Sequence, residues 1–220
     1  AAAMKGSQAL LDANAVYSLE DLLRTTIMAS ANDSAVALAE YLAGTEQAFV
    51  ERMNARASEI GMADTLYVNC TGYPQSGQHT TARDVMRLCC EVARHPDYFR
   101  YASVWIDKLT HPGGRVTDLT NTNRLVRFYA GCDGFKTGST DAAKYCVAAT
   151  AEKNGMRLVA VVLGASNSQT RFNEARQMLE YGFAAYQRTT VARKGDLLGQ
   201  SLSVRGGSSE EVPLMLGNGL

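Results

Sequence analysis

Long apolar runs, an excess of one charge and clustered metal ligands are all missing from this sequence of 220 residues. No run approaches the roughly 20 apolar residues that span a bilayer. Lys+Arg and Asp+Glu number 22 each, and without a basic patch nucleic acid is not expected as a partner. The five cysteines and three histidines are scattered, with no C-x-x-C pair. We therefore expect no metal site, no cofactor and no disulfide framework, and we interpret the cysteines as small buried hydrophobic residues.

Helix signals dominate the first half of the sequence. Ser18, Thr45 and Thr81 are residue types that commonly cap helix N-termini, and each precedes an apolar stripe at helical spacing. Gly44 is typical of a helix C-terminus and follows an Ala- and Leu-rich helix. A polar loop at 69–80 separates the third predicted helix from the fourth, and its length favours a functional role.

Strand signals dominate the second half. A hairpin is predicted over 105–119, and Asn154-Gly155, a strong hairpin signal, separates the β-rich runs 145–151 and 156–163. The apolar character of these runs indicates strands covered on both faces. A helix is predicted over 170–186. The fold class is therefore α/β of the α+β type, a helical cluster packed on an antiparallel sheet.

The pattern of predicted secondary structure changes near the end of the sequence. Residues 195–216 are predicted as short strands interrupted at Gly206-Gly207. We therefore expect one domain at 1–187, and at 188–220 a linker with the beginning of a small β-rich domain that the chain does not complete.

Ser30-Ala31-Asn32, between two predicted helices, is the first candidate site. A hydroxyl can relay a proton, and a carboxamide can both donate to and accept from a substrate amide. An ordinary helix N-cap explains the same residues, since Ser and Asn are favoured there.

Lys136-Thr137-Gly138 is the second candidate site, on a predicted strand. Lysine supplies positive charge, threonine offers a hydroxyl to a carboxylate, and a strand glycine lets an extended peptide approach the edge. The alternative is an exposed strand with a lysine that protects its edge.

Together, Ser-x-Asn and a Lys-Thr-Gly 106 residues later have the order and spacing of two of the three motifs of penicillin-binding enzymes. The surrounding stretches, among them IMASANDSAVALAEYLAGTEQAF and TNTNRLVRFYAGCDGFKTGST, match as well. To about Gln187, the sequence resembles the serine-type D-alanyl-D-alanine carboxypeptidases, the penicillin-binding proteins of low molecular mass. The resemblance implies their β-lactamase-like fold and removal of the terminal D-alanine from peptidoglycan stem peptides.

The resemblance also implies a role for each matching residue. Catalytic roles fall to Ser30 as proton relay, to Asn32 as holder of the substrate amide and to Lys136 as the charge that positions Ser30. The substrate-binding residues would be Thr137 for the carboxylate, Gly138 for the substrate strand, Ser139 for the oxyanion through its N–H, and Arg171 for the terminal carboxylate. One departure is Lys144, where many members of the family have glycine.

The third motif of the family, Ser-x-x-Lys with the nucleophile and its base, is absent, because no serine here is followed by lysine three positions later. In the family this motif lies further upstream than the 29 residues before Ser30 allow. We therefore interpret the chain as a truncated fragment and expect it to form no acyl-enzyme by itself.

Two other functions remain open: a class A β-lactamase-like hydrolase, with Glu91 the acidic candidate, and a non-catalytic cell-wall binding module. Expected partners are a stem peptide ending in D-Ala-D-Ala, β-lactam antibiotics, and a homodimer or partner segment that supplies the missing part. The parent protein is expected to be extracytoplasmic, on the outer side of the cytoplasmic membrane. The sequence itself shows no signal or anchor pattern.

Overall fold

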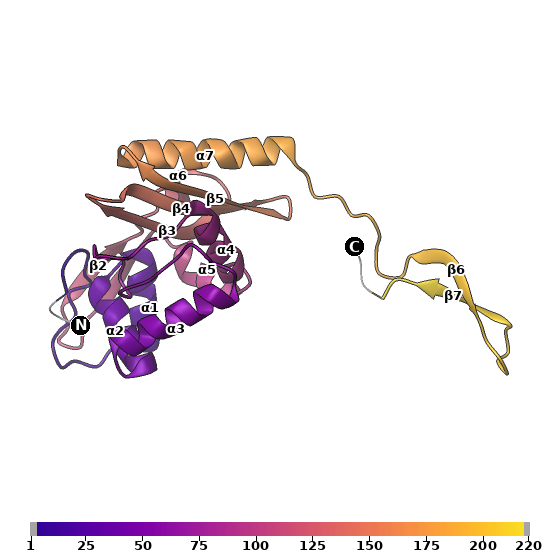
Figure 1. Ribbon diagram of the computed structural model, residues 1–220, viewed down its shortest axis with the longest axis horizontal. Helices are drawn as coiled ribbons and strands as arrows, with labels where there is room; N and C mark the ends of the chain where they lie inside the picture. The colour runs from indigo at the N-terminus through magenta and orange to yellow at the C-terminus, as the bar shows by residue number, and fades with distance from the viewer. Residues whose placement is uncertain (1–3, 218–220) are drawn as a thin grey trace. The chain divides into compact units, whose positions relative to one another are not determined.

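The computed structural model describes residues 4–217 and divides the chain after Ala185, with a second unit from Tyr186 onward. Figure 1 shows the elements in chain order. They are α1 (Leu19–Met28), α2 (Asn32–Ala43), α3 (Glu46–Glu59), α4 (Ala82–Val92), α5 (Pro96–Ala102), β1 (Ile106–Thr110), β2 (Val116–Thr120), α6 (Leu125–Phe128), β3 (Cys132–Thr140), β4 (Lys144–Lys153), β5 (Met156–Ala165), α7 (Ser168–Ala185), β6 (Leu197–Ser203) and β7 (Glu211–Met215).

The sheet of the first unit is antiparallel, in the order β3-β4-β5, and helices cover both of its faces (Figure 1). On one face α7 packs Phe172, Ala175 and Leu179 against buried residues of β4 and β5. On the other, α4 and α5 surround Phe135 of β3. The predicted fold class is therefore confirmed, including strands that are covered on both sides.

The β4–β5 hairpin has the turn that its sequence predicts. Asn154 and Gly155 have φ angles of +53° and +72°, as a two-residue type I′ turn requires. The hairpin at β1 and β2 is also confirmed, with Ile106 opposite Thr120.

Three predicted helix starts are confirmed by their capping hydrogen bonds. The hydroxyls of Ser18, Thr45 and Thr81 accept from backbone N–H groups three residues on, over 3.0, 3.1 and 3.2 Å. The helices α5 and α6, which have 7 and 4 residues, were not predicted from the sequence. Such segments are too short for helical periodicity to become visible.

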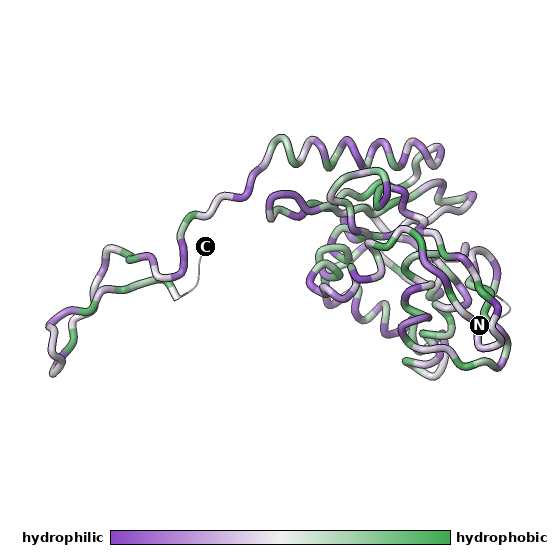
Figure 2. The backbone as a smooth tube through the Cα atoms, turned by 180° about the vertical axis from the view of Figure 1, so that it is seen from behind, coloured by the Kyte–Doolittle hydropathy of each residue, from purple (hydrophilic) through white to green (hydrophobic). Residues whose placement is uncertain are grey.

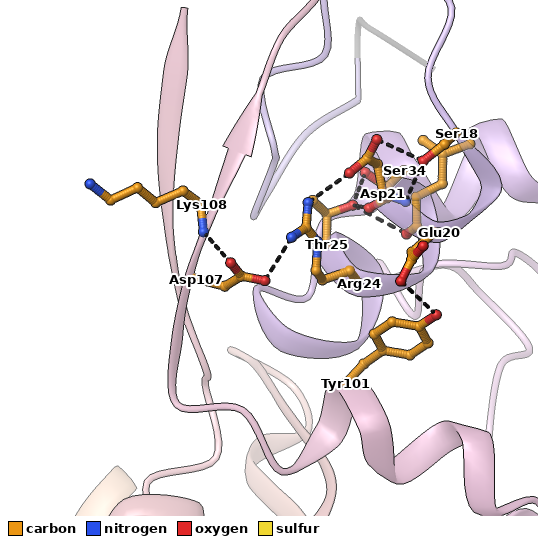
Figure 3. Close-up of polar contacts among 10 residues, drawn as sticks. Ser18, Glu20, Asp21, Arg24, Thr25, Ser34, Tyr101, Asp107 and Lys108 are labelled. Atoms are coloured by element: carbon orange, nitrogen blue, oxygen red, sulfur yellow. Dashed lines mark hydrogen bonds and ion pairs between the residues drawn. The ribbon is translucent and has the colours of Figure 1, made fainter.

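An ion-pair network fixes α1 to the β1–β2 hairpin (Figure 3). Arg24 binds Asp21 of its own helix at 2.6 Å and Asp107 of β1 at 2.7 Å. The buried Thr25 hydroxyl donates to Ser34 of α2 over 2.8 Å. These contacts join α1 to β1 on one side and to α2 on the other.

The cysteines only partly match their interpretation as buried hydrophobic residues. Cys89 and Cys132 are buried, whereas Cys90 is exposed. The prediction was wrong for Cys90 because it lies on the outer side of the amphipathic helix α4, next to the buried Cys89. All five cysteines are free thiols.

The second unit is a hairpin of β6 and β7, with Leu202 opposite Val212. Figure 2 shows hydrophobic stretches along it, and its apolar side chains are exposed, Leu202 by 59% and Met215 by 60%. A two-stranded hairpin is only marginally stable alone. A larger β-rich domain at 188–220 remains a prediction. None of the helices within residues 4–217 has both the length and the apolar character needed to cross a membrane.

Candidate active site

Ser30 lies in a sharp turn between α1 and α2. Its φ angle of +59° is left-handed, which costs a residue other than glycine about 1–2 kcal/mol. The turn is secured by the N–H groups of Ala31 and Asn32, which donate to Thr25 and Ser7 carbonyls over 3.2 and 2.8 Å. Ser30 does not cap α2, because the N-cap is Ala31. The helix-cap explanation is therefore wrong for Ser30, whose side chain is free for another partner.

That partner is Lys136 of β3. Its Nζ donates to Ser30 Oγ over 2.6 Å and to the Thr137 carbonyl over 2.9 Å. The fold thus joins the two sequence motifs into one cluster. Burial and, to a smaller extent, the positive charge of Arg171 together lower the pKa of Lys136 to about 8. At neutral pH the ammonium group still carries its proton, so Ser30 Oγ accepts and its own proton remains available.

The lowered pKa of Lys136 predicts a specific dependence of stability on pH. An unfolded chain keeps this proton up to about pH 10.5, whereas the folded chain loses it near pH 8. Between these values the unfolded state binds more protons, so the folded state gains stability as pH rises. Urea unfolding across this window should show wild type gaining stability relative to Lys136→Met. Lys108→Met, at an exposed lysine of β1, corrects for the lost charge. If the free energy of unfolding changes with pH in the same way for wild type and Lys136→Met, the lowered pKa does not belong to Lys136.

The rest of the second motif lies at an edge of the described sheet. Thr137 is buried, and its hydroxyl donates to Thr122 Oγ1 over 2.8 Å. Gly138 and Ser139 are exposed. A Cβ added at Gly138 would meet no atom within 4 Å. Because β3 has a strand neighbour on one side only, an extended peptide has room to pair with it.

Asn32 is placed next to Ser30 in the chain, but its carboxamide has another partner. Its Nδ2 donates to the Lys5 carbonyl over 2.7 Å. A Cβ at the neighbouring Gly6 would come within 2.7 Å of Asn32 Nδ2, so glycine allows this close approach. No hydrogen bond joins Asn32 to Lys136 or Thr137 among the residues described.

Arg171 of α7 reaches the same end of β3 from the other side of the sheet. Its Nη1 donates to the carbonyls of Gly138 and Cys146 over 3.0 and 3.1 Å, and its Nη2 donates to Ser168 Oγ over 3.3 Å. The side chain is 8% exposed, and burial lowers its pKa. Arg171 therefore hydrogen-bonds to both β3 and β4, and its guanidinium group does not face solvent.

Three buried polar residues that support the site were not singled out from the sequence. Asp33 accepts from the N–H groups of Ala9, Leu11 and Ser34. Asn121 donates to the carbonyls of Ala102 and Val104, and Asn123 donates to that of Gly134, so both fix the segment that precedes α6. A buried polar residue has the same sequence signal as an exposed one, so only its position beside a motif could have identified it.

Lys144, where the resemblance led us to expect glycine, has a backbone conformation that favours glycine. Its φ angle is +57°, a left-handed conformation that costs about 1–2 kcal/mol without glycine. Lys144→Gly removes this cost, but glycine loses roughly 0.5–1 kcal/mol more chain entropy on folding. The free energy of unfolding should therefore rise by only about 0.5 kcal/mol. Thermal and urea unfolding would measure it. Asn154→Gly, at φ +53°, should gain less because asparagine tolerates this region. A loss of stability in Lys144→Gly would contradict this explanation.

No metal site accompanies the cluster in the described residues, where no three His, Cys, Asp or Glu gather. A groove of about 550 Å³ lies elsewhere, lined mainly by α3. None of the predicted site residues lines it. The carboxylate of Glu91 binds Arg56 at 2.6 Å and Arg94 at 3.3 Å.

Comparisons with known proteins bear directly on this geometry. Residues 1–167 match the family model of D-alanyl-D-alanine carboxypeptidases. The carboxypeptidase DacF of Bacillus subtilis is 34% identical over 214 residues, 97% of this chain and 55% of the relative. DacC of Escherichia coli is also 34% identical, over 98% of this chain and 53% of the relative. The chain thus spans about half the length of these curated relatives.

Solved structures agree with the sequence comparisons. Penicillin-binding protein 5 of Haemophilus influenzae superimposes with a TM-score of 0.82 at 29% identity, over 97% of this chain and 61% of that one. DacD of Francisella tularensis gives 0.83 at 25% identity, over 100% and 65%. With two motifs joined in the fold and a family match over most of its length, the chain belongs to the D-alanyl-D-alanine carboxypeptidase family.

Proposed function

We propose that this chain supplies the substrate-binding and electrostatic part of a serine DD-carboxypeptidase. The whole enzyme would remove the terminal D-alanine from peptidoglycan stem peptides and bind penicillins. The observation that carries the proposal is the 2.6 Å contact between Lys136 Nζ and Ser30 Oγ. In this proposal the Ser30 hydroxyl would relay a proton and Lys136 would supply a positive charge, beside a strand edge that is open in the described sheet.

The chemistry is acyl transfer. A serine attacks the D-Ala-D-Ala carbonyl, D-alanine leaves with a proton, and water then hydrolyses the ester. In this scheme Ser30 passes the proton and Lys136 holds Ser30 in place. Thr137 and Gly138 receive the substrate's carboxylate and backbone, and the Ser139 N–H stabilises the oxyanion. Losing one oxyanion donor typically costs ~10²–10³ in rate.

The attacking serine is not assigned to any residue here, since no Ser-x-x-Lys occurs among the 220 residues. We propose that a partner segment provides it, and that this segment or a second copy of the chain covers the rest of the core. The chain alone would then bind ligand but form no acyl-enzyme. We further propose that the protein acts outside the cytoplasmic membrane, where peptidoglycan lies.

The test measures binding and covalent chemistry in the same sample. Isothermal titration of the chain with an Nα-acylated tripeptide ending in D-Ala-D-Ala should show saturable binding. The diastereomer ending in L-Ala-L-Ala should bind much more weakly, because its methyl groups point the opposite way along β3. Intact mass after incubation with a penicillin should be unchanged. Equal binding of both peptides would refute the proposed site, and a stoichiometric penicillin adduct would refute the division of roles.

A non-catalytic cell-wall binding module is the second candidate. This function would need no attacking serine, and both candidates predict the same selectivity for D-Ala-D-Ala. The two proposals can be distinguished by adding, as a separate polypeptide, a segment of a family member that carries Ser-x-x-Lys. Release of D-alanine supports the enzyme, and binding without release supports the module.

A further inference from the structure

Thr122, in the segment between β2 and α6, contacts both halves of the proposed site. Its backbone N–H donates to the Met28 carbonyl at the end of α1 over 3.0 Å. Its hydroxyl accepts from the Thr137 hydroxyl of β3 over 2.8 Å. Met28 lies two residues before Ser30, and Thr137 follows Lys136 directly. One residue therefore joins the turn of the first motif to the strand of the second.

Two buried asparagines hold this segment in place. Asn121 is 3% exposed, and its Nδ2 donates to the carbonyls of Ala102 and Val104 over 2.8 and 2.9 Å. Asn123 is fully buried, and its Nδ2 donates to the Gly134 carbonyl of β3 over 2.9 Å. The backbone N–H of Asn123 donates to Asn121 Oδ1 over 2.9 Å. Buried hydrogen bonds of this kind are costly to break, so the residue between the two asparagines has a fixed position.

The contact between the two motifs is sensitive to this alignment. Lys136 Nζ donates to Ser30 Oγ over 2.6 Å and to the Thr137 carbonyl over 2.9 Å. A hydrogen bond weakens steeply as its geometry departs from the optimum, so a shift of β3 relative to the end of α1 would weaken the contact between Nζ and Oγ. The Thr122 hydroxyl opposes such a shift, because it binds the same strand residue whose carbonyl accepts from Nζ.

We propose that Thr122 is a positioning residue of the DD-carboxypeptidase site, which keeps the Ser30 turn and β3 in a fixed relative position for the substrate. It acts through the Met28 carbonyl and the Thr137 hydroxyl rather than by contacting the reacting atoms. This inference rests on the proposed function and adds to it a residue that lies outside both motifs. Valine has nearly the same shape as threonine, but it would leave the Thr137 hydroxyl without its partner.

The first experiment needs no ligand. The side-chain amine of Lys136 is titrated by ¹⁵N NMR in the full chain as wild type, Thr122→Val, Thr122→Ser and Thr80→Val. Thr80 is a matched control, because its hydroxyl lies 2.8 Å from that of Thr65 in an exposed pair. Thr122→Val should admit water beside Lys136 and raise its pKa from about 8 to roughly 9, since burial is what lowers it. Thr122→Ser keeps the hydroxyl and should behave as wild type, as should Thr80→Val.

The second experiment titrates the same four proteins with the acylated D-Ala-D-Ala peptide and its L-Ala-L-Ala diastereomer. Thr122→Val should reduce the ratio of the two affinities by about fivefold, the loss of one hydrogen bond that aligns the site. Thr122→Ser should keep the ratio of wild type. Urea unfolding of each protein completes the set, since a residue that only stabilised the fold would change stability without changing the ratio or the pKa of Lys136.

Both changes are required of Thr122→Val. If either the pKa of Lys136 or the affinity ratio keeps its wild-type value in this variant, the positioning role is overturned. Equal changes in Thr122→Val and Thr80→Val overturn it as well, because the loss of any threonine pair would then have the same effect. If wild type itself does not discriminate between the two peptides, the proposed function fails, and a raised pKa of Lys136 in Thr122→Val distinguishes that failure from a failure of the alignment.

Discussion

Replacing Asp33 by alanine is expected to lower the free energy of unfolding by about 3–5 kcal/mol, one of the largest effects of any single substitution in the chain. The carboxylate is 1% exposed. It accepts from the N–H groups of Ala9, Leu11 and Ser34 over 2.9, 3.0 and 2.9 Å. Removing it leaves these donors without their acceptor, at roughly 1–3 kcal/mol for each one that stays buried.

Urea unfolding of Asp33→Ala measures this loss directly. Asp118→Ala is the matched control, since its side chain is 78% exposed and lies 3.9 Å from Lys108. An exposed pair of this kind contributes roughly 0–1 kcal/mol. Because Asp33 follows Asn32 and anchors residues 9–11 to α2, its loss should also weaken binding of the D-Ala-D-Ala peptide. A loss below about 1 kcal/mol would show that water replaces the carboxylate.

Phe135→Ala is expected to cost about 3–5 kcal/mol. Phe135 is 4% exposed and lies 5.7 Å from the ring of Tyr98 and 5.8 Å from that of Phe99, measured between centroids. The substitution removes the aromatic contacts that attach β3 to α5 and leaves a cavity. Since Lys136 follows directly, strand and site should loosen together.

The control for Phe135 is Phe128→Ala in α6, at a side chain that is 68% exposed. It removes the same atoms from a surface position and should cost less than about 1 kcal/mol. Comparable losses in the two variants would mean that the cluster of Phe135 with α4 and α5 does not carry the stability assigned to it.

The sequence was informative where local chemistry determines local structure. Capping residues such as Ser18 and Thr45, and the Asn154-Gly155 turn, act within a few residues, so the helices and hairpins they begin or close could be predicted. The motifs at Ser30 and Lys136 identified the family because their order and spacing are characteristic. The fold class followed from these elements.

Features that depend on tertiary packing could not be read from the sequence. The inward orientation of Arg171, the engagement of Asn32 by the Lys5 carbonyl and the burial of Asp33 all depend on segments that are distant in the chain. The left-handed conformations of Ser30 and Lys144 are also imposed by their surroundings, because neither residue type favours a positive φ angle. Contacts of this kind decide which polar residues remain free for a ligand.

The most direct test of the account maps where the peptide binds. The ¹⁵N-labelled chain is titrated with the acylated D-Ala-D-Ala peptide while its backbone amide signals are followed. We predict that the signals of 30–32 and 136–139 shift together and saturate, whereas those of 197–215 in the second unit stay in place. Shifts confined to other parts of the chain, or none near Ser30 and Lys136 at saturation, would contradict the claim that these two motifs form one substrate site.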